Sequence, residues 1–169
     1  MRDVSLFLHN FPELAPHLAA ADYSDEVRTR TAVGLRSYLS GMTAPPPAWL
    51  RALFALRTPL ATALSTPKAL SFQTMSPSAV PFNPGGRFGP FEVETAQEER
   101  LWLGVHEASS LTARLAVAFE SLPCGERLYH MATIVRFKSA RGRLYMALIR
   151  PFHVMICARL ARRGGWGGV

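Results

Sequence analysis

Hydrophobic and polar residues alternate along several short stretches of the chain, most clearly between residues 111 and 120. There Leu115 and Val117 alternate with Arg114 and Ala116. Successive side chains of a β-strand point to opposite faces, so this period of two predicts a strand. Related patterns predict strands over residues 22–31, 91–96, 101–106 and 128–138. The last four of the five segments are joined by short links, which predicts an antiparallel sheet because parallel strands need long crossovers.

From residue 141 onward the pattern takes the period of an α-helix and predicts one long helix over residues 141–163. Its large apolar residues recur at intervals of three and four: Tyr145, Leu148, Ile149, Phe152, Met155 and Ile156. Pro151 removes one hydrogen bond and is expected to bend this helix near residues 147–150. Burial of the six side chains would contribute on the order of 10 kcal/mol before the entropy cost. We therefore expect the helix to pack this apolar face across the sheet.

Shorter helices are predicted between the first strand and the rest of the sheet. One over residues 32–39 is expected to end at Gly41. The prolines at 45–47 begin another, in which Trp49, Leu50, Leu53 and Phe54 recur at helical spacing, and Thr58-Pro59 begins a third that reaches about Leu64. Residues 70–75 are a candidate strand, and residues 83–86, Asn-Pro-Gly-Gly, predict a turn.

Basic residues are concentrated at the carboxyl-terminal end. The chain has 19 Lys or Arg residues against 12 Asp or Glu residues, a net charge of +7. Nine of the basic residues, and none of the acidic ones, lie from Arg127 onward. Such a charge attracts anionic partners such as a membrane surface or a nucleic acid, but it is also common in proteins that bind neither. Aromatic residues of the kind that stack bases are not interleaved with the basic ones, so no nucleic acid is expected.

Length and composition predict one globular domain. The chain has 169 residues, of which 49% are hydrophobic and 18% charged, as in proteins that bury a sizeable core. We expect the domain to span residues 1–163 and residues 164–169 to form a flexible tail. The sequence does not indicate an oligomeric state.

Neither metal nor cofactor chemistry is indicated. Cys124 and Cys157 have no metal-ligand or redox spacing, and Cys157 is expected to be a buried, inert thiol. The first ten residues contain too short an apolar run for a signal peptide. Arg150, His153 and Arg159 interrupt the best candidate for a membrane span, so no stable membrane insertion is expected. The expected location is the cytoplasm.

Several sequences in this chain resemble an uncharacterised bacterial family, domain of unknown function 2867. They are residues 132–136 (ATIVR), 142–145 (GRLY) and 149–153 (IRPFH), with weaker similarity at 21–25 and 49–57. The resemblance implies an α+β helix-grip fold of the START-like superfamily, which includes polyketide cyclases and lipid-transfer domains. In that fold a curved antiparallel sheet packs on a long C-terminal helix, with short helices after the first strand. It further implies a cavity between sheet and helix that suits apolar or aromatic small molecules. Members often carry His-Asn before the Gly-Arg pair, whereas this chain has Lys138-Ser139.

Seven residues are the candidate ligand-binding residues of such a cavity: Trp49, Phe54, Arg114, Thr133, Tyr145, Ile149 and His153. Thr133 and Tyr145 combine apolar bulk with a hydroxyl group. Arg114 has two interpretations, a cavity residue or a surface residue paired with a Glu across the sheet.

His153 and Arg150 also have two interpretations. Their spacing of three lets them share one face of the helix and contact a ligand. In the structural alternative, which we favour, Arg150 pairs with Asp22, Asp25 or Glu26 and His153 fills a gap at the sheet edge. No residue is assigned as catalytic, since His106 and His130 on predicted strands are more typical of hydrogen-bonded scaffold positions than of general bases.

Three functions compete. The leading hypothesis is the binding of an apolar or aromatic, lipid-like or polyketide-like small molecule between the sheet and the C-terminal helix. The first alternative is a cyclase-like or dehydratase-like enzyme that uses a cavity His or Tyr; we favour a binding module over an enzyme. The second alternative is peripheral binding to an anionic membrane or a nucleic acid through the basic C-terminal region.

Overall fold

The computed structural model describes residues 4–45 and 73–166. Within them, six strands form one antiparallel sheet in the order β1-β6-β5-β4-β3-β2. The strands are β1 (Tyr23–Thr31), β2 (Arg87–Phe88), β3 (Phe91–Gln97), β4 (Leu101–Glu107), β5 (Leu111–Ser121) and β6 (Arg127–Phe137). The five predicted strands are confirmed to within one or two residues at each end, and the short strand β2 is additional. The helices predicted from residue 47 onward, with Trp49 and Phe54, lie outside the described residues.

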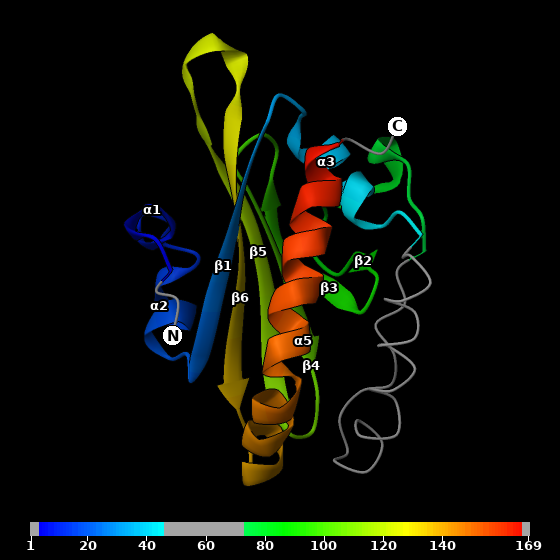
Figure 1. Cartoon of the computed structure of the whole chain (residues 1–169). Helices are drawn as coiled ribbons and strands as arrows, with labels where there is room; N and C mark the ends of the chain where they lie inside the picture. The colour runs from blue at the N-terminus through cyan, green and yellow to red at the C-terminus, as the bar shows by residue number, and fades with distance from the viewer. Residues whose placement is uncertain (1–3, 46–72, 167–169) are drawn as a thin grey trace.

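The described helices are α1 (Leu6–His9), α2 (Ala15–Ala19), α3 (Leu35–Met42) and α5 (Ala140–Gly165), with short 3-10 helices at Pro77–Ala79 and Pro123–Gly125. Helix α5 lies along one face of the curved sheet, while α1 and α2 lie on the opposite side (Figure 1). This arrangement confirms the α+β, helix-grip fold class.

Helix α3 begins and ends three residues later than predicted. Its first residue follows Gly34, and Gly41 lies inside the helix instead of ending it. A Cβ atom at Gly41 would lie 2.6 Å from the Arg163 carbonyl oxygen of α5. The glycine is therefore explained by the close crossing of two helices, which sequence spacing does not reveal.

The candidate strand over residues 70–75 was wrong in its described part. Residues 73–75 have no regular secondary structure. The Met75 amide donates to the Thr43 hydroxyl (2.9 Å), and the Ser40 hydroxyl donates to the Met75 carbonyl (2.6 Å). Its backbone is thus bonded to side chains at the end of α3. The predicted turn at residues 83–86 is confirmed by a hydrogen bond from the Gly86 amide to the Asn83 carbonyl.

Helix α5 is rotated relative to its predicted orientation. Leu148, Phe152 and Met155, which we expected against the sheet, are 48%, 46% and 46% exposed. The inward-facing side keeps Tyr145, Ile149 and Ile156 of the predicted face, which are buried or half-buried. It also carries residues that were not expected there: Gly142, Met146, His153, Cys157, Ala161 and Gly164. Small side chains let a helix approach a neighbouring backbone closely, and this outweighs the apolar bulk on the other side. The helix also continues to Gly165, two residues beyond the predicted end.

Glycines hold α5 at both ends. A Cβ atom at Gly142 would collide with the Ser110 carbonyl oxygen in the β4–β5 turn. At the other end, a Cβ atom at Gly164 would lie 2.9 Å from the Tyr38 carbonyl oxygen on α3. The helix is therefore seated by backbone contacts that tolerate no side chain.

A dense core fills the space between the sheet and the helices α3 and α5. Trp102 is fully buried and donates from its indole nitrogen to the Pro81 carbonyl (3.0 Å). Tyr38 and Tyr129 stack with ring centroids 4.0 Å apart. The other buried members are Leu35, Leu39, Met42, Val80, Phe88, Val93, Leu115, Val117, Met131, Cys157 and Ala161.

A second core covers the opposite face of the sheet. Leu8, Phe11 and Leu14 from the N-terminal segment pack on Leu101, Leu103, Ala116, Ala118 and Ala132. The segment is fixed by the Ser5 amide, which donates to Glu26 Oε2 (2.5 Å), and by the tilted Phe7 and His130 rings, 4.6 Å apart. The centre of the sheet is thus buried on both sides.

Candidate functional site

A polar cluster interrupts the apolar interface between α5 and the sheet at the β1 edge. Tyr23 and Asp25 belong to β1, Thr133 lies opposite Asp25 on β6, and His153 and Cys157 face them from α5. Odd-numbered residues of both strands face the helix, because alternate strand residues share a face. His153 and Cys157 share a face because they are one helical turn apart.

His153 lies at the centre of this cluster. Its Nε2 atom is 3.4 Å from Asp25 Oδ2 and 3.4 Å from Cys157 Sγ. The Tyr23 hydroxyl donates to Asp25 Oδ2 (3.0 Å), and the Thr133 hydroxyl is 3.8 Å from Cys157 Sγ. Five side chains from two strands and one helix thus form a continuous polar chain.

The electrostatics of the cluster favour a charged pair. Burial alone would lower the pKa of His153, but the Cys157 sulfur and the Asp25 carboxylate raise it to about 10. Burial alone would raise the pKa of Asp25, yet the hydrogen bond and charge of His153, with help from Tyr23 and Thr133, hold it below its usual value. Burial and the nearby Asp25 charge raise the pKa of the Tyr23 hydroxyl. Near neutral pH the site therefore contains an imidazolium, a carboxylate and a neutral phenol.

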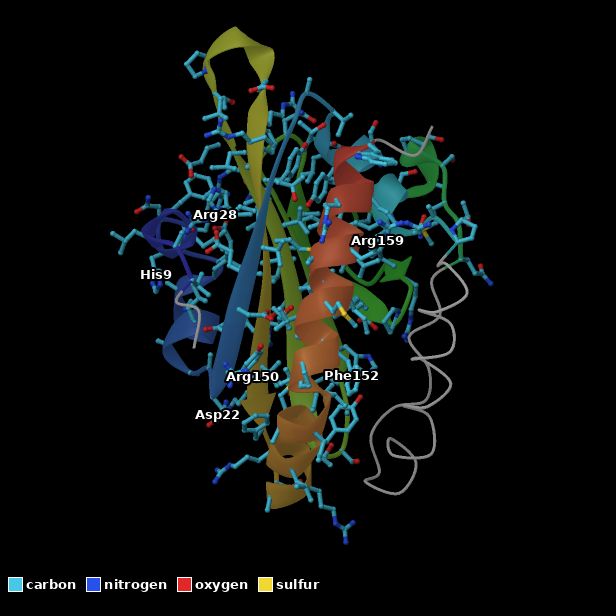
Figure 2. All side chains as sticks on the ribbon, viewed as in Figure 1. His9, Asp22, Arg28, Arg150, Phe152 and Arg159 are labelled. Carbon is cyan, nitrogen blue, oxygen red and sulfur yellow. The ribbon has the colours of Figure 1, made fainter. Side chains whose placement is uncertain are left out.

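A shallow hollow of about 70 Å³ adjoins this cluster and shares Tyr23 and Asp25 with it. Its lining residues are Tyr23, Asp25, Glu26, Val27, Arg150 and Val154. The Arg150 guanidinium lies 5.9 Å from the centre of the Tyr23 ring, a cation–π distance. Figure 2 shows Arg150 on the β1 side of α5, with Asp22 near the same end of the strand.

The structure brings four of the seven predicted site residues to this region. Thr133 and His153 belong to the polar cluster itself. Tyr145 and Ile149 pack beside it, in an apolar cluster that also includes Tyr23. Trp49 and Phe54 lie outside the described residues.

Arg114 lies on the other face of the sheet. Its Nε atom donates to Glu94 Oε2 (2.8 Å), and His17 from α2 is 3.4 Å from the same carboxylate. The surface interpretation of Arg114, with a Glu neighbour across the sheet, matches this geometry. Arg114 does not face the space between the sheet and α5.

The expected ion pair of Arg150 takes a different form. Within the described residues Arg150 contacts the Tyr23 ring, and His153 is the residue that meets Asp25. The structural alternative was therefore correct that a carboxylate of β1 pairs with α5, but the residue of α5 that it meets is His153 and not Arg150. The reason is the rotation of α5, which turns His153 inward and leaves Arg150 exposed.

Sequence reasoning did not place Tyr23 and Cys157 in the site, and it named Asp25 only as one of three possible partners of Arg150. Cys157 is buried as predicted, but its sulfur contacts His153, so its surroundings are not purely apolar. The spacing of four between His153 and Cys157 was a usable signal. Which of Asp22, Asp25 and Glu26 meets the helix, and through which residue, depends on the tertiary position of β1 relative to α5.

The remaining histidines of interest have scaffold contacts. His106 Nδ1 lies 2.8 Å from the Pro90 carbonyl. His130, on the outer face, is 2.6 Å from Glu26 and 2.7 Å from Glu120, one carboxylate at each ring nitrogen. Across residues 4–45 and 73–166, no group of three or more His, Cys, Asp or Glu side chains is arranged to hold a metal ion.

Together, the fold and the site define an α+β protein of helix-grip type. Its polar cluster lies between the last helix and the first strand. The chain belongs to the family described as "Protein of unknown function (DUF2867)", whose model matches residues 17–160. A search of curated proteins gives no match. Among solved structures, the one titled "Crystal structure of Ara h 8.0201" is similar, with 9% identity, a TM-score of 0.40, and coverage of 84% of this chain and 97% of that chain.

Proposed function

We propose that this protein binds a small molecule with an apolar or aromatic body at the seam between α5 and β1. The observation that carries the proposal is the hollow lined by Tyr23, Asp25, Arg150 and Val154, which shares Tyr23 and Asp25 with the buried polar cluster. Binding sites combine apolar walls with a few fixed polar groups, and this seam has both.

The charges suggest which end of a ligand would lie where. Arg150 is exposed and carries a guanidinium that suits a carboxylate or another anionic group. Asp25 lies deeper and accepts hydrogen bonds, so it suits a hydroxyl donor. An aromatic ring or short aliphatic chain would pack on Tyr23, Val27 and Val154. The ligand class is therefore a hydroxylated, weakly acidic apolar molecule.

The size of the hollow limits how much of a ligand it receives. Sites for drug-sized molecules occupy roughly 300–1,000 Å³, against about 70 Å³ here. On the sheet side of α5, large side chains such as Trp102 and Tyr129 fill the described interior. We therefore propose that the hollow holds one polar end of the ligand while its body lies along the β1 edge.

Native mass spectrometry of freshly purified full-length protein tests the proposal first, since a retained ligand adds a defined mass. A panel of hydroxylated aromatic acids is then titrated by calorimetry, with the uncharged amide of each acid as its partner compound. We expect the acids to bind and Arg150→Gln to weaken them by roughly 10-fold, the scale of a lost charged hydrogen bond. Arg143→Gln, at another exposed arginine of α5, is the matched control.

Two results would contradict this function. The first is a protein that carries no added mass and binds no member of the panel. The second is an equal loss of affinity in Arg150→Gln and Arg143→Gln, which would indicate a general charge effect and no defined site.

A second candidate, a cyclase-like or dehydratase-like enzyme, is favoured by one observation: His153 lies within 3.4 Å of both Asp25 and Cys157. A titratable group held between two others is typical of proton transfer. If the bound ligand is converted, His153→Gln is expected to abolish turnover and to remove a limb of the pH–rate profile while ligand binding persists.

A cytoplasmic location and the lack of a nucleic-acid partner remain predictions of the sequence.

A further inference from the structure

Helix α5 has a row of large apolar side chains on the side that faces away from the sheet. Leu144, Leu148, Phe152 and Met155 are 53%, 48%, 46% and 46% exposed. Their spacing of four, four and three places them on one helical face. We call these four residues the outer stripe. It lies on the opposite side of the helix from Arg150, as the labels of Phe152 and Arg150 show (Figure 2), so it is separate from the proposed ligand site.

The outer stripe is an exposed apolar face of α5, on the other side of the helix from the residues that face the sheet. By length and composition, this helix is apolar enough to cross a membrane, and only 22% of its most apolar window is buried. A row of large exposed apolar side chains on one helical face is normally a site of contact with protein or with lipid. Here one side is covered by the β4–β5 turn at Gly142, by β1 at His153 and by α3 at Gly164. The other side has large apolar residues in contact with solvent.

Positive charges border the outer stripe at both ends. Arg141 lies one turn before Leu144, and Arg159 and Arg162 lie one and two turns after Met155. Figure 2 places Arg159 on the same side of α5 as Phe152. No Asp or Glu occurs between Arg127 and the end of the chain. Trp166, 80% exposed at the end of the helix, is four residues beyond Arg162.

We propose that the outer stripe docks the protein reversibly onto the surface of an anionic lipid membrane. Apolar side chains flanked by arginines, with a tryptophan at the boundary, are the composition of helices that lie in the membrane interface. Leu148 and Phe152 enter the acyl boundary while Arg141 and Arg162 contact lipid phosphates. The helix lies flat and does not cross the bilayer, because its other side is fixed to the sheet by Gly142 and the His153–Asp25 pair.

Charge argues against the other occupants of this face. Two copies of the chain that paired through their outer stripes would bring Arg141, Arg159 and Arg162 of each against the basic ends of the other, with no described carboxylate on α5 to neutralise them. Nucleic acid would use the arginines and gain little from Leu148 and Phe152, because phosphate contacts dominate such binding.

Vesicle flotation with the full-length protein tests the docking. The probes are neutral phosphatidylcholine vesicles and vesicles with 30% phosphatidylserine, at 50 mM and at 300 mM salt. We expect binding to the anionic vesicles alone, weakened by salt, with a blue shift of tryptophan emission that Trp166→Phe removes. The double variant Leu148→Asp/Phe152→Asp is expected to lose roughly 10-fold or more of the partitioning. Leu6→Asp, at an 85% exposed leucine of α1 on the far side of the molecule, is the matched control and is expected to bind normally.

Any of the following four outcomes would overturn the proposal. Binding to duplex DNA or RNA that depends on Arg159 and Arg162 but not on Leu148 would assign the face to nucleic acid. A dimer in solution that Leu148→Asp dissociates would assign it to a second copy. A fall in the melting temperature of the double variant without lipid would show that the chain itself covers the outer stripe. Failure to bind either vesicle at low salt would remove the docking altogether.

Discussion

His153 Nε2 lies 3.4 Å from Asp25 Oδ2, and this contact joins the last helix of the chain to its first strand. The pair is 128 residues apart in sequence. Asp25 is buried and His153 is mostly buried, so a lone charge there would be costly and a matched pair is tolerated. The two groups therefore depend on each other for their ionised states.

The first prediction concerns the pH dependence of this pair. The pKa of His153 is raised to about 10, from 6.5 in an unfolded chain. Its contribution to stability is therefore fully present below pH 6.5 and is lost as the pH rises through about 10. Asp25→Asn is expected to reduce the free energy of unfolding by on the order of 2 kcal/mol near pH 6, and by much less at pH 10. Urea unfolding at pH 6, 8 and 10 measures the difference.

Asp22→Asn is the control for that series. Asp22 is exposed and accepts a hydrogen bond from the Phe137 amide (2.7 Å). Its partner is not a histidine, so its replacement is expected to have the same effect on stability at each pH. A pH-independent effect of Asp25→Asn, equal to that of Asp22→Asn, would show that the His153 contact does not stabilise the fold.

The second prediction concerns the anchoring of the N-terminal segment. Glu26 accepts from the Ser5 amide and lies against His130 and Arg28. Glu26→Gln weakens all three contacts in a buried setting and is expected to cost about 2–4 kcal/mol. Glu98→Gln, in the exposed pair with Arg36, is expected to cost less than about 1 kcal/mol. Chemical denaturation measures both.

The same carboxylate predicts a loss of stability in acid. Burial alone would raise the pKa of Glu26, but His130, Arg28 and the Ser5 amide lower it to about 2. Its contribution is present above its unfolded pKa of 4.5 and is lost as the pH falls through about 2. Amide hydrogen exchange in α1 and α2 is expected to accelerate in acid before exchange in β5 does. Simultaneous acceleration in all elements would mean that the N-terminal segment has no separate acid sensitivity.

The third prediction tests the seating of α5. Helix propensity alone predicts that Gly142→Ala stabilises the protein by about 1 kcal/mol. We expect a loss of about 2–3 kcal/mol instead, because the new methyl group would collide with the Ser110 carbonyl. Ala147→Gly, at an exposed position of the same helix, is expected to cost about 1 kcal/mol. If Gly142→Ala raised the melting temperature, the close contact with the β4–β5 turn would be refuted.

The fourth prediction separates the two faces of the sheet. Arg114 pairs with Glu94 on the face that α1 and α2 cover, whereas the proposed ligand lies at the α5–β1 seam. Arg114→Met is expected to leave ligand affinity unchanged and to reduce stability by about 1 kcal/mol. Calorimetry and thermal unfolding of the same sample measure both quantities. A loss of ligand affinity comparable to that of Arg150→Gln would move the site to the other face.

The sheet was predictable because apolar and polar residues alternate along its strands, and this alternation is a local property of the sequence. The alternation from Leu111 to Glu120 and the short links between strands depend only on the chain's own period of two. The covering of the outer face by Leu8, Phe11 and Leu14 was not predicted, since α1 and α2 are too short to show a helical period. The small residues Ala116, Ala118 and Ala132 on that face were the available signal.

The site was only partly predictable, because it depends on how α5 is rotated. The apolar residues of the helix predicted a side that included Leu148 and Phe152 against the sheet. Close approach at Gly142 and Gly164 turned the helix so that His153 and Cys157 face inward. The spacing of His153 and Cys157 showed that they are neighbours on one helix. The contact between His153 and Asp25 could be seen only in the tertiary structure.

His153 faces Asp25 of β1 and Gly164 faces Tyr38 of α3, eleven residues apart on the same side of α5. Eleven residues make about three turns, so both positions lie on the same side of the helix. Inserting or deleting one residue between them would turn one by about 100° against the other. Either the imidazole would leave Asp25 or the glycine would leave Tyr38. The length of this segment is therefore fixed by two contacts that lie at different heights along the same helix.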